Sequence, residues 1–316
     1  MEEYAYNDND NCVTFFVKSA MLKEIRLYLR RIIMPNFKIV TDSTTELSAE
    51  EIDRYGITVI PLSSMIDNVL YYDGVTITKP EFLEKMMNSK ELPKSSQPAM
   101  GTFLDKYNEL TADGSEVLSI HVTETLSGTV NSAHQAAKLA HGKVTVIDSK
   151  FCARATAFQV LEAAKCAAEG LTVAEALPRV TAVKDRTLLY ISIVNLENMV
   201  KGGRIGKTMG RITTLLNIKA NLKMIDGALT TDIKGRGTKA IVKRYEEIIE
   251  ELKQKYLDVE AIGITHDGLS EYSNQIIGML KAAFPNARMH TSYASASVMT
   301  HAGPEAVSFQ FLMKSN

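Results

Sequence analysis

Phe37-Lys38-Ile39-Val40-Thr41 is a short, mostly apolar run that opens the regular part of the chain. Residues 48–55 follow it with the spacing of a helix, and residues 57–62 form a second apolar run. A strand, a helix and another strand in this order are typical of a βαβ unit. This stretch therefore predicts an α/β fold.

The same alternation continues to about residue 190. Short apolar runs and helical patterns predict buried parallel strands at 117–122, 144–147 and 188–194, with helices at 100–111, 129–140 and 153–169. We expect an N-terminal α/β domain with a parallel βαβ sheet at residues 34–188.

After about residue 190 the pattern changes. Asp226-Gly227 separates runs at 221–225 and 228–233, which predicts a hairpin with a type I′ turn. Further elements are predicted at 239–256 (helix), 260–265 (strand), 270–284 (helix), 287–293 and 306–311 (strands). We expect a C-terminal α/β domain with a mixed sheet at 189–316, and a ligand between the two domains.

Residues 1–33 differ in composition from the rest. A polar start precedes residues 20–33, which carry the basic side chains of Lys23, Arg26, Arg30 and Arg31. A basic amphipathic helix that touches a membrane is one interpretation. We favour an N-terminal extension outside the fold, because Met34 lies directly before the first clear strand.

Length and composition narrow the function classes. At 316 residues the chain exceeds the usual size of one domain. A net charge of -1 lacks the positive field that nucleic acid or an anionic membrane would require, so neither is expected as a main partner. Cys12, Cys152 and Cys166 have no C-x-x-C spacing, which favours reduced thiols over disulfides or zinc. No apolar run reaches the roughly 18 residues of a membrane span, so we expect a soluble, cytoplasmic protein. No metal site is expected either.

Lys201-Gly202-Gly203-Arg204-Ile205-Gly206-Lys207-Thr208 looks like a nucleotide-binding loop but does not fit one. A Walker-type loop needs Gly where this chain has Lys201, and it follows a strand. Residues 195–200 are instead spaced like a helical turn. We favour a glycine-rich helix end, at which Arg204 and Lys207 offer positively charged partners to the last carbonyls of the helix.

Polar residues directly after strands are the candidates for a binding site, because ligands of doubly wound sheets lie at the carboxyl ends of strands. Such groups occur at 41–45, 95–98, 123–129 and 300–304. Helix capping is the ordinary alternative for the first two groups. The hydroxyls of the third exceed what capping needs. The other histidines are taken as structural, but His301 stands beside a Gly-Pro turn.

Motifs of enzymes are missing from the sequence. It contains no G-x-S-x-G nucleophile elbow, no H-E-x-x-H and no G-x-G-x-x-G after a strand. A triad assembled from Ser95, His301 and Asp42 would have no basis in spacing. No catalytic residue is therefore predicted.

Taken together, the polar groups form an ordered set of short motifs. In chain order these are Val40-Thr41-Asp42-Ser43-Thr44, Tyr72-Asp73-Gly74, Ser96-Gln97-Pro98, Leu126-Ser127-Gly128-Thr129, Ile147-Asp148-Ser149, Leu196-x-x-Met199-x-Lys201-Gly202-Gly203-Arg204-Ile205 and His301-x-Gly303-Pro304. On these motifs the chain resembles the DegV family over about residues 36–313.

The resemblance implies a carrier rather than an enzyme. Members of the family bury one long-chain fatty acid between two domains, and many serve as the fatty-acid-binding subunit of bacterial fatty acid kinase. The partner, a dihydroxyacetone-kinase-like fatty acid kinase, would supply ATP and convert the carboxylate to an acyl phosphate for phospholipid metabolism. No cofactor is implied beyond the bound fatty acid, and no stable membrane insertion.

The resemblance also assigns residues. It places the fatty-acid carboxylate at Ser95, Ser96, Thr123 and His301, with Ser43, Glu124, Ser127 and Gly128 as further candidates, and it assigns docking of the kinase to Arg204. Hydroxyls and an imidazole suffice for a carboxylate, since each charge-assisted hydrogen bond contributes roughly 1.5–3 kcal/mol. An acyl chain of some fifteen carbons contributes on the order of 12 kcal/mol by leaving water.

Two departures from the family pattern affect the head group. Thr123-Glu124 stand where many members have Ser-Ser, which brings an acidic side chain close to the expected fatty-acid carboxylate. The two carboxylates would repel each other unless one is protonated or Glu124 points away. Near His301, Ser295 and Ala296 replace a Gly-Pro pair of the family pattern, Met299 replaces a Gly, and Ala302 and Glu305 replace a Thr and a Gly.

Two other function classes stay open. One is a small-molecule phosphotransferase or hydrolase that uses the same cleft, which predicts ATP binding or turnover by the isolated chain. The other is a regulatory protein that senses lipid without a kinase, which predicts that no kinase co-purifies with it.

Overall fold

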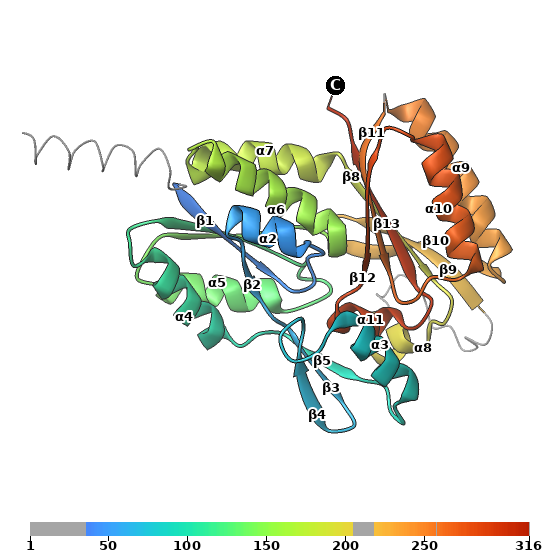
Figure 1. The fold of residues 1–316 in the computed structure, drawn as a ribbon, viewed down its shortest axis with the longest axis horizontal. Coiled ribbons are helices and arrows are strands. Elements are labelled where there is room, and N and C mark those ends of the chain that lie inside the picture. The colour runs from blue at the N-terminus through green and yellow to red at the C-terminus, as the bar shows by residue number, and fades with distance from the viewer. Residues whose placement is uncertain (1–35, 205–217, 257, 316) are drawn as a thin grey trace, which may run out of the picture.

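The computed structural model describes residues 36–204, 218–256 and 258–315. Two sheets stand side by side with helices between and around them (Figure 1). The first is four-stranded, in the order β2-β1-β6-β7, and the second is six-stranded, in the order β10-β9-β8-β13-β11-β12. The predicted α/β class, with a parallel and a mixed sheet, is confirmed. The extension 1–33 lies outside the described residues.

The four-stranded sheet is entirely parallel. Its strands are β1 (Phe37–Asp42), β2 (Thr58–Ile60), β6 (Glu116–His121) and β7 (Val144–Asp148), and its helices are α2 (Ala49–Tyr55), α4 (Met100–Thr111), α5 (Thr129–Leu139), α6 (Ala153–Ala168) and α7 (Val173–Asp185). One face packs against α6 and α7, and the other against α4 and α5. Both faces are thus covered, which explains why its strands are mostly apolar.

The six-stranded sheet is mixed. It contains β8 (Thr187–Ile193), β9 (Ile218–Ile225), β10 (Ala228–Arg236), β11 (Val259–His266), β12 (Arg288–Tyr293) and β13 (Val307–Met313). Its outer face is covered by α9 (Lys239–Lys255) and α10 (Glu271–Ala283) (Figure 1). The aromatic rings of Tyr245 and Phe309, both fully buried, meet in this layer with their centroids 4.9 Å apart. Helix α6 packs between the two sheets.

The strand predicted at 188–194 is present, but its predicted parallel pairing is wrong. It is β8, which pairs antiparallel with β13 and with β9 in the mixed sheet. Layers on both faces bury this strand, so its apolar run looks like that of a parallel strand. Sheet membership changes between β7 and β8, close to the predicted division at 188/189, and the division itself stays a prediction.

A third, small sheet was not predicted. Its strands are β3 (Ser63–Ile66), β4 (Val69–Tyr72) and β5 (Lys94–Ser96), and α3 (Lys79–Asn88) follows β4. It projects at the bottom of Figure 1, beside α3 and α11 (Ala296–Ala302). Both turn residues of the β3–β4 hairpin, Asp67 and Asn68, have positive φ angles, as a type I′ turn requires. The predicted type I′ turn at Asp226-Gly227 is confirmed in the same way.

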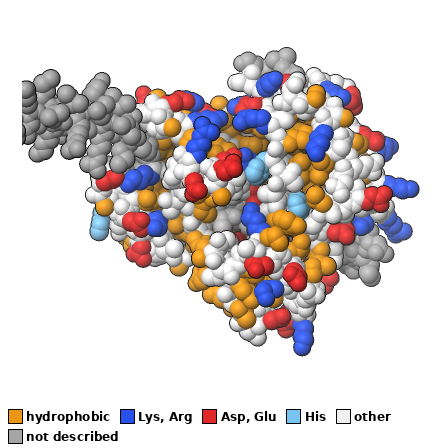
Figure 2. Space-filling view, viewed as in Figure 1, with side chains coloured by type: hydrophobic (Ala, Val, Ile, Leu, Met, Phe, Trp, Pro, Cys, Tyr) orange, Lys and Arg blue, Asp and Glu red, His pale blue; other side chains and the backbone are white. Residues whose placement is uncertain are grey.

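Charged side chains of both signs occupy the face drawn in Figure 2. Acidic and basic side chains are interspersed across that face in Figure 2, in keeping with the net charge of -1. Within the described ranges, no helix is long and apolar enough to cross a membrane.

Candidate functional site

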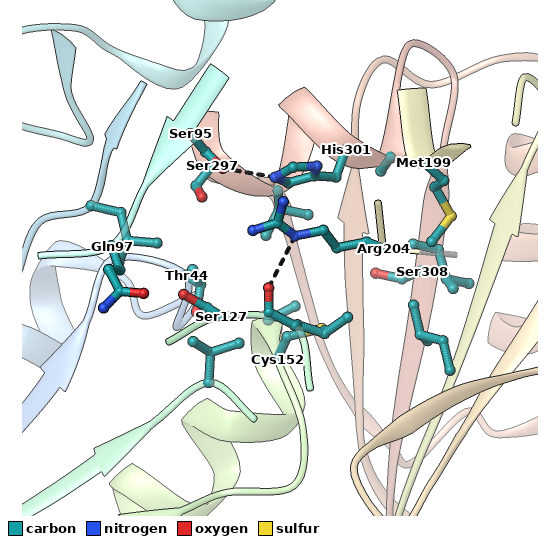
Figure 3. Close-up of a pocket in the computed structure, with 18 of the residues that line it drawn as sticks. Thr44, Ser95, Gln97, Ser127, Cys152, Met199, Arg204, Ser297, His301 and Ser308 are labelled. Carbon is teal, nitrogen blue, oxygen red and sulfur yellow. Dashed lines mark hydrogen bonds between the residues drawn. The ribbon is translucent and has the colours of Figure 1, made fainter. Parts of the chain in front are cut away.

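A cavity of about 340 Å³ lies where the parallel sheet, the mixed sheet and the small sheet meet (Figure 3). Its apolar wall includes Val122, Leu126, Leu189, Ile191, Met199 and Leu229. Its polar lining includes Ser95, Ser96, Gln97, Ser127, Arg204 and His301. The volume is within the range of pockets that bind small ligands, and the mainly apolar wall with a few polar groups is typical of them.

Two of the predicted carboxylate ligands meet across this cavity. Ser95 is on β5 of the small sheet, and His301 is in the last turn of α11. Their side chains are hydrogen-bonded, with Ser95 Oγ 2.7 Å from His301 Nε2 (Figure 3). The N-cap of α11 is Ser295, whose hydroxyl accepts a hydrogen bond from the N–H of Val298. The turn expected beside His301 is present at Pro304 and Glu305, directly after this short helix. The interpretation of Ser95 as a helix cap is wrong, because the N-cap of α4 is Ala99.

His301 is a neutral imidazole at physiological pH. Burial, reinforced by the nearby positive charge of Arg204, lowers its pKa to about 4. Its Nδ1 has no hydrogen-bond partner among the described residues and faces the Cα of Gly202, where a Cβ would come within 2.3 Å. A neutral imidazole can donate one hydrogen bond and accept another, so His301 would contact a ligand by hydrogen bonding and not by a positive charge.

Arg204 is the one charged side chain at neutral pH among the described residues that line the cavity. Helix α8 (Glu197–Lys201) ends at Gly202, and Gly203 takes a positive φ of 71° that turns the chain toward the cavity. The guanidinium donates from Nη1 to the carbonyl of Gly202 (2.6 Å) and from Nε to the carbonyl of Leu126 (3.2 Å). The predicted glycine-rich helix end, with Arg204 at its carbonyls, is confirmed. Lys207, Gly206 and Thr208 lie outside the described residues.

Three further candidates lie near the same wall. Ser96 and Ser127 line the cavity, and Ser127 Oγ accepts a hydrogen bond from the N–H of Thr129 at the start of α5. The side chain of Gln97 packs directly against Gly128, where a Cβ would come within 2.0 Å of the Gln97 amide oxygen. The Gln97 amide also donates to Ser132 Oγ at 2.7 Å.

Thr123 and Glu124 lie outside the cavity lining. The fully buried hydroxyl of Thr123 donates to the carbonyl of Gly227 at the tip of the β9–β10 hairpin, at 3.2 Å. Glu124 is exposed and forms an ion pair with Lys150 at 3.2 Å. Glu124 thus points away from the cavity, which removes the repulsion expected for a carboxylate bound there.

Ser43 faces a different cavity. Its Oγ accepts a hydrogen bond from the N–H of Leu62 (2.9 Å) and donates to Asp73 (3.1 Å). Residues 41–45 do not cap the helix that follows, because the N-cap of α2 is Ser48. Thr44, next in sequence, does line the first cavity.

Ser64 was missed by the sequence reasoning. It lies on β3 directly opposite Ser95 on β5, its side chain is fully buried, and its Oγ has no hydrogen-bond partner in the described part of the chain. A buried hydroxyl without a partner is unfavourable, so it is available to a ligand or a water. Two adjacent serines after an apolar run were the available signal, but only the strand pairing brings Ser64 to Ser95.

A buried network resembles a catalytic triad but is structural. His121 Nδ1 lies 3.0 Å from Asp42 Oδ2, and His121 Nε2 lies 2.6 Å from Ser119 Oγ. All three side chains are fully buried, and Ser119 also bonds to the Tyr107 hydroxyl at 2.8 Å. A nucleophile must reach its substrate, and none of these residues lines the cavity. The structural role predicted for His121 fits this arrangement.

Cys152 lines the cavity just before α6, but its chemistry is not that of a nucleophile. Burial raises the pKa of its thiol to about 12, so the thiol stays protonated. Among residues 36–204, 218–256 and 258–315, no group of three or more His, Cys, Asp or Glu side chains is placed to hold a metal ion.

Relatives of known sequence share almost the whole chain. A family model described as an uncharacterised protein of the DegV family matches residues 36–314. A DegV domain-containing protein of Streptococcus pneumoniae is 41% identical over 273 residues, which cover 86% of this chain and 97% of the relative. Another from Listeria monocytogenes is 40% identical over 284 residues, covering 88% and 99%.

Solved structures share the fold. A DegV family protein from Thermus thermophilus, described by its fatty acid binding, matches with a TM-score of 0.80 and 26% identity over 88% of this chain and 99% of its own. DegV from Bacillus subtilis, described as a fatty acid binding protein, matches with a TM-score of 0.79 and 27% identity over 89% and 100%. With the ordered motifs, the two-sheet fold and these matches over nearly its full length, the chain belongs to the DegV family.

Proposed function

We propose that this protein binds one long-chain fatty acid in the cavity between its two sheets. The observation that carries the proposal is the cavity itself, in which an apolar wall from β8, β10 and α8 adjoins hydroxyls, an imidazole and a guanidinium. Removal of an acyl chain of some fifteen carbons from water contributes on the order of 12 kcal/mol, so the wall would supply most of the affinity. The fatty-acid-binding descriptions of two structural relatives support this assignment.

The carboxylate would bind at the end of the cavity that holds Ser95, Ser96 and His301. Ser95 and Ser96 line the cavity and can donate hydrogen bonds to it, and Arg204 supplies the compensating charge that a buried anion needs. The unpartnered hydroxyl of Ser64 lies outside the lining but directly opposite Ser95, where it can support the same hydrogen bonds. We do not include the side chain of Thr123, because its hydroxyl already donates to Gly227. The direct role of Arg204 at the carboxylate is an addition to the kinase docking that the family resemblance implies.

In the same proposal the protein is a carrier subunit. A dihydroxyacetone-kinase-like fatty acid kinase would dock over Arg204 and phosphorylate the carboxylate to an acyl phosphate, in the cytoplasm where ATP is available. The test is to mix the loaded protein with such a kinase and ATP and to measure acyl phosphate. A loaded protein that is no substrate, and that no kinase accompanies on purification, would indicate a lipid sensor instead.

Lipid binding is tested by mass spectrometry of the purified protein under native and denaturing conditions, followed by organic extraction. We expect one fatty acid per chain, released on denaturation. Ala302→Leu, which adds bulk inside the cavity, is expected to lower the lipid content, whereas Ala112→Leu on the exposed surface is not. A protein that arrives empty and takes up no added fatty acid would refute the proposal.

One observation favours a second candidate, a hydrolase. The Ser95–His301 contact at 2.7 Å has the geometry of a nucleophile and a base. Against it, His301 Nδ1 has no acidic partner in the described ranges, and a pKa of about 4 makes the imidazole a weak base. We expect no turnover of acyl esters or ATP by the isolated chain, and turnover that Ser95→Ala abolishes would establish this alternative.

A further inference from the structure

A second cavity, of about 210 Å³, lies on the other side of the loop that follows β1. We name it the Asp73 cavity. Its apolar wall includes Leu47, Ile52, Val59, Pro61, Val75 and Ile77, and its polar lining consists of Ser43, Thr45, Asp73, Thr78, Lys79 and Ser295. No part of the function proposed above uses this space.

Asp73 is the group in this lining with unmet hydrogen-bonding capacity. It is only 7% exposed. Its Oδ2 accepts hydrogen bonds from Ser43 Oγ (3.1 Å) and from the N–H of Ser297 (3.4 Å), but its Oδ1 has no partner within the described ranges. A buried carboxylate oxygen without a donor is unfavourable, and a bound donor would relieve that cost.

The other polar side chains of the lining already have partners. Thr45 bonds to Thr41, Thr78 bonds to Glu81, and the Ser295 hydroxyl accepts from Val298. The ammonium of Lys79 pairs with Glu46 and donates to the carbonyl of Tyr293. Asp73 Oδ1, itself buried, is therefore the one side-chain oxygen of this lining without any hydrogen-bond partner in the described ranges, and the rest of the wall is largely apolar.

The charges around Asp73 favour a cation. Lys79 supplies one positive charge, but the buried carboxyl of Glu46 already pairs with it, and the negative charge of Asp73 is left over. Burial, with a contribution from Glu46, raises the pKa of Asp73 to about 7, so the carboxyl is partly ionised at neutral pH. A bound cation would stabilise its ionised form.

We propose that the Asp73 cavity binds a small organic cation. Its ammonium group pairs with Asp73 Oδ1, and its apolar body lies against Leu47, Ile52 and Val59. A metal ion fits poorly, because more than half of the lining side chains carry no oxygen atom and no three-residue metal cluster is found in the described part of the chain. The end of an acyl chain fits poorly too, since it would leave Asp73 Oδ1 without a partner.

The test uses the full-length, lipid-loaded protein, so that its outcome does not depend on an empty fatty-acid cavity. Hexylammonium is the probe and 1-hexanol its uncharged counterpart, with binding followed by chemical-shift changes in NMR spectra. Asp73→Asn is compared with Asp67→Asn, a control on the exposed turn of the β3–β4 hairpin. We expect saturable binding of hexylammonium to the wild type and to Asp67→Asn, at least ~10-fold weaker binding to Asp73→Asn, and weaker binding of 1-hexanol.

The pH dependence in the wild type gives a second test that needs no variant. Because the ammonium pairs with the ionised carboxyl, affinity is expected to rise up to ~10-fold per pH unit below the pKa of Asp73 and to level off above it. Three results would overturn the proposal: no saturable binding at about pH 8, equal binding of 1-hexanol, or an affinity that neither pH nor Asp73→Asn changes.

Discussion

Replacement of Ser95 by Ala separates head-group recognition from acyl-chain binding. The substitution removes one hydroxyl from the cavity and leaves the apolar wall intact, and it also removes the 2.7 Å hydrogen bond to His301 Nε2. Because His301 is neutral at pH 7, the imidazole cannot replace the lost donor with a positive charge. The effect of Ser95→Ala should therefore depend on the ligand's head group.

The magnitude follows from the number of bonds lost. One hydrogen bond to a carboxylate contributes about 1.5–3 kcal/mol, which corresponds to roughly 10- to 150-fold in affinity. The acyl chain contributes on the order of 12 kcal/mol, so the variant should still hold its lipid. For a fatty alcohol of the same length, which has no charged head group, we expect a change of less than about threefold.

The assay is a competition between a fatty acid and the alcohol of equal length for the delipidated protein, with the bound ratio read by mass spectrometry. Ser95→Ala is expected to lower the acid-to-alcohol preference by the factor above. An equal loss for both ligands would show that Ser95 supports the cavity rather than the head group. An unchanged ratio would show that the carboxylate binds elsewhere.

The remaining predictions concern the charge, the helix end and the buried acid. Arg204→Gln should keep lipid bound but lower both the acid-to-alcohol preference and the rate of phosphorylation by the kinase, and complete loss of lipid would contradict this. Gly202→Ala should displace the His301 ring and lower the acid-to-alcohol preference, because the new Cβ would lie 2.3 Å from Nδ1. Gly203→Ala is the control: its Cβ would enter open space, but its positive φ is strained for alanine, so it should lower the melting temperature and leave the acid-to-alcohol preference unchanged. Asp73 has a pKa raised from 3.8 to about 7, so its stabilising effect is present below 3.8 and lost as pH rises through 7. Asp73→Asn should therefore gain stability relative to the wild type over this pH range, by up to on the order of 4 kcal/mol, and a pH-independent difference in denaturant unfolding would contradict it.

The parallel sheet and most helices could be predicted because their signals are local. The strand of Phe37 and the apolar stripe of α9 are visible in a single stretch of sequence, and Asp226-Gly227 defines its own turn. The small sheet could not be predicted, since β3, β4 and β5 have only three or four residues each and are stabilised by partners across the fold. The direction of β8 was wrong for a related reason, because burial on both faces hides the pairing partner.

The candidate site shows the same division between local and distant information. The motifs around Ser95, Arg204 and His301 correctly indicated segments that line the cavity. The contact between Ser95 and His301 could not be predicted, because it joins residues more than two hundred positions apart in the chain. Ser64 became a candidate only when the strand pairing placed it opposite Ser95. The sequence suggested that Glu124 would repel a bound carboxylate, but in the structure Glu124 forms an ion pair with Lys150 outside the cavity.

The loop after β1 is a partition one residue thick. Thr44 lies on the side of the larger cavity, while its neighbours Ser43 and Thr45 lie on the side of the Asp73 cavity. Because Thr44 and its two neighbours face different cavities, a substitution in this loop alters the walls of both.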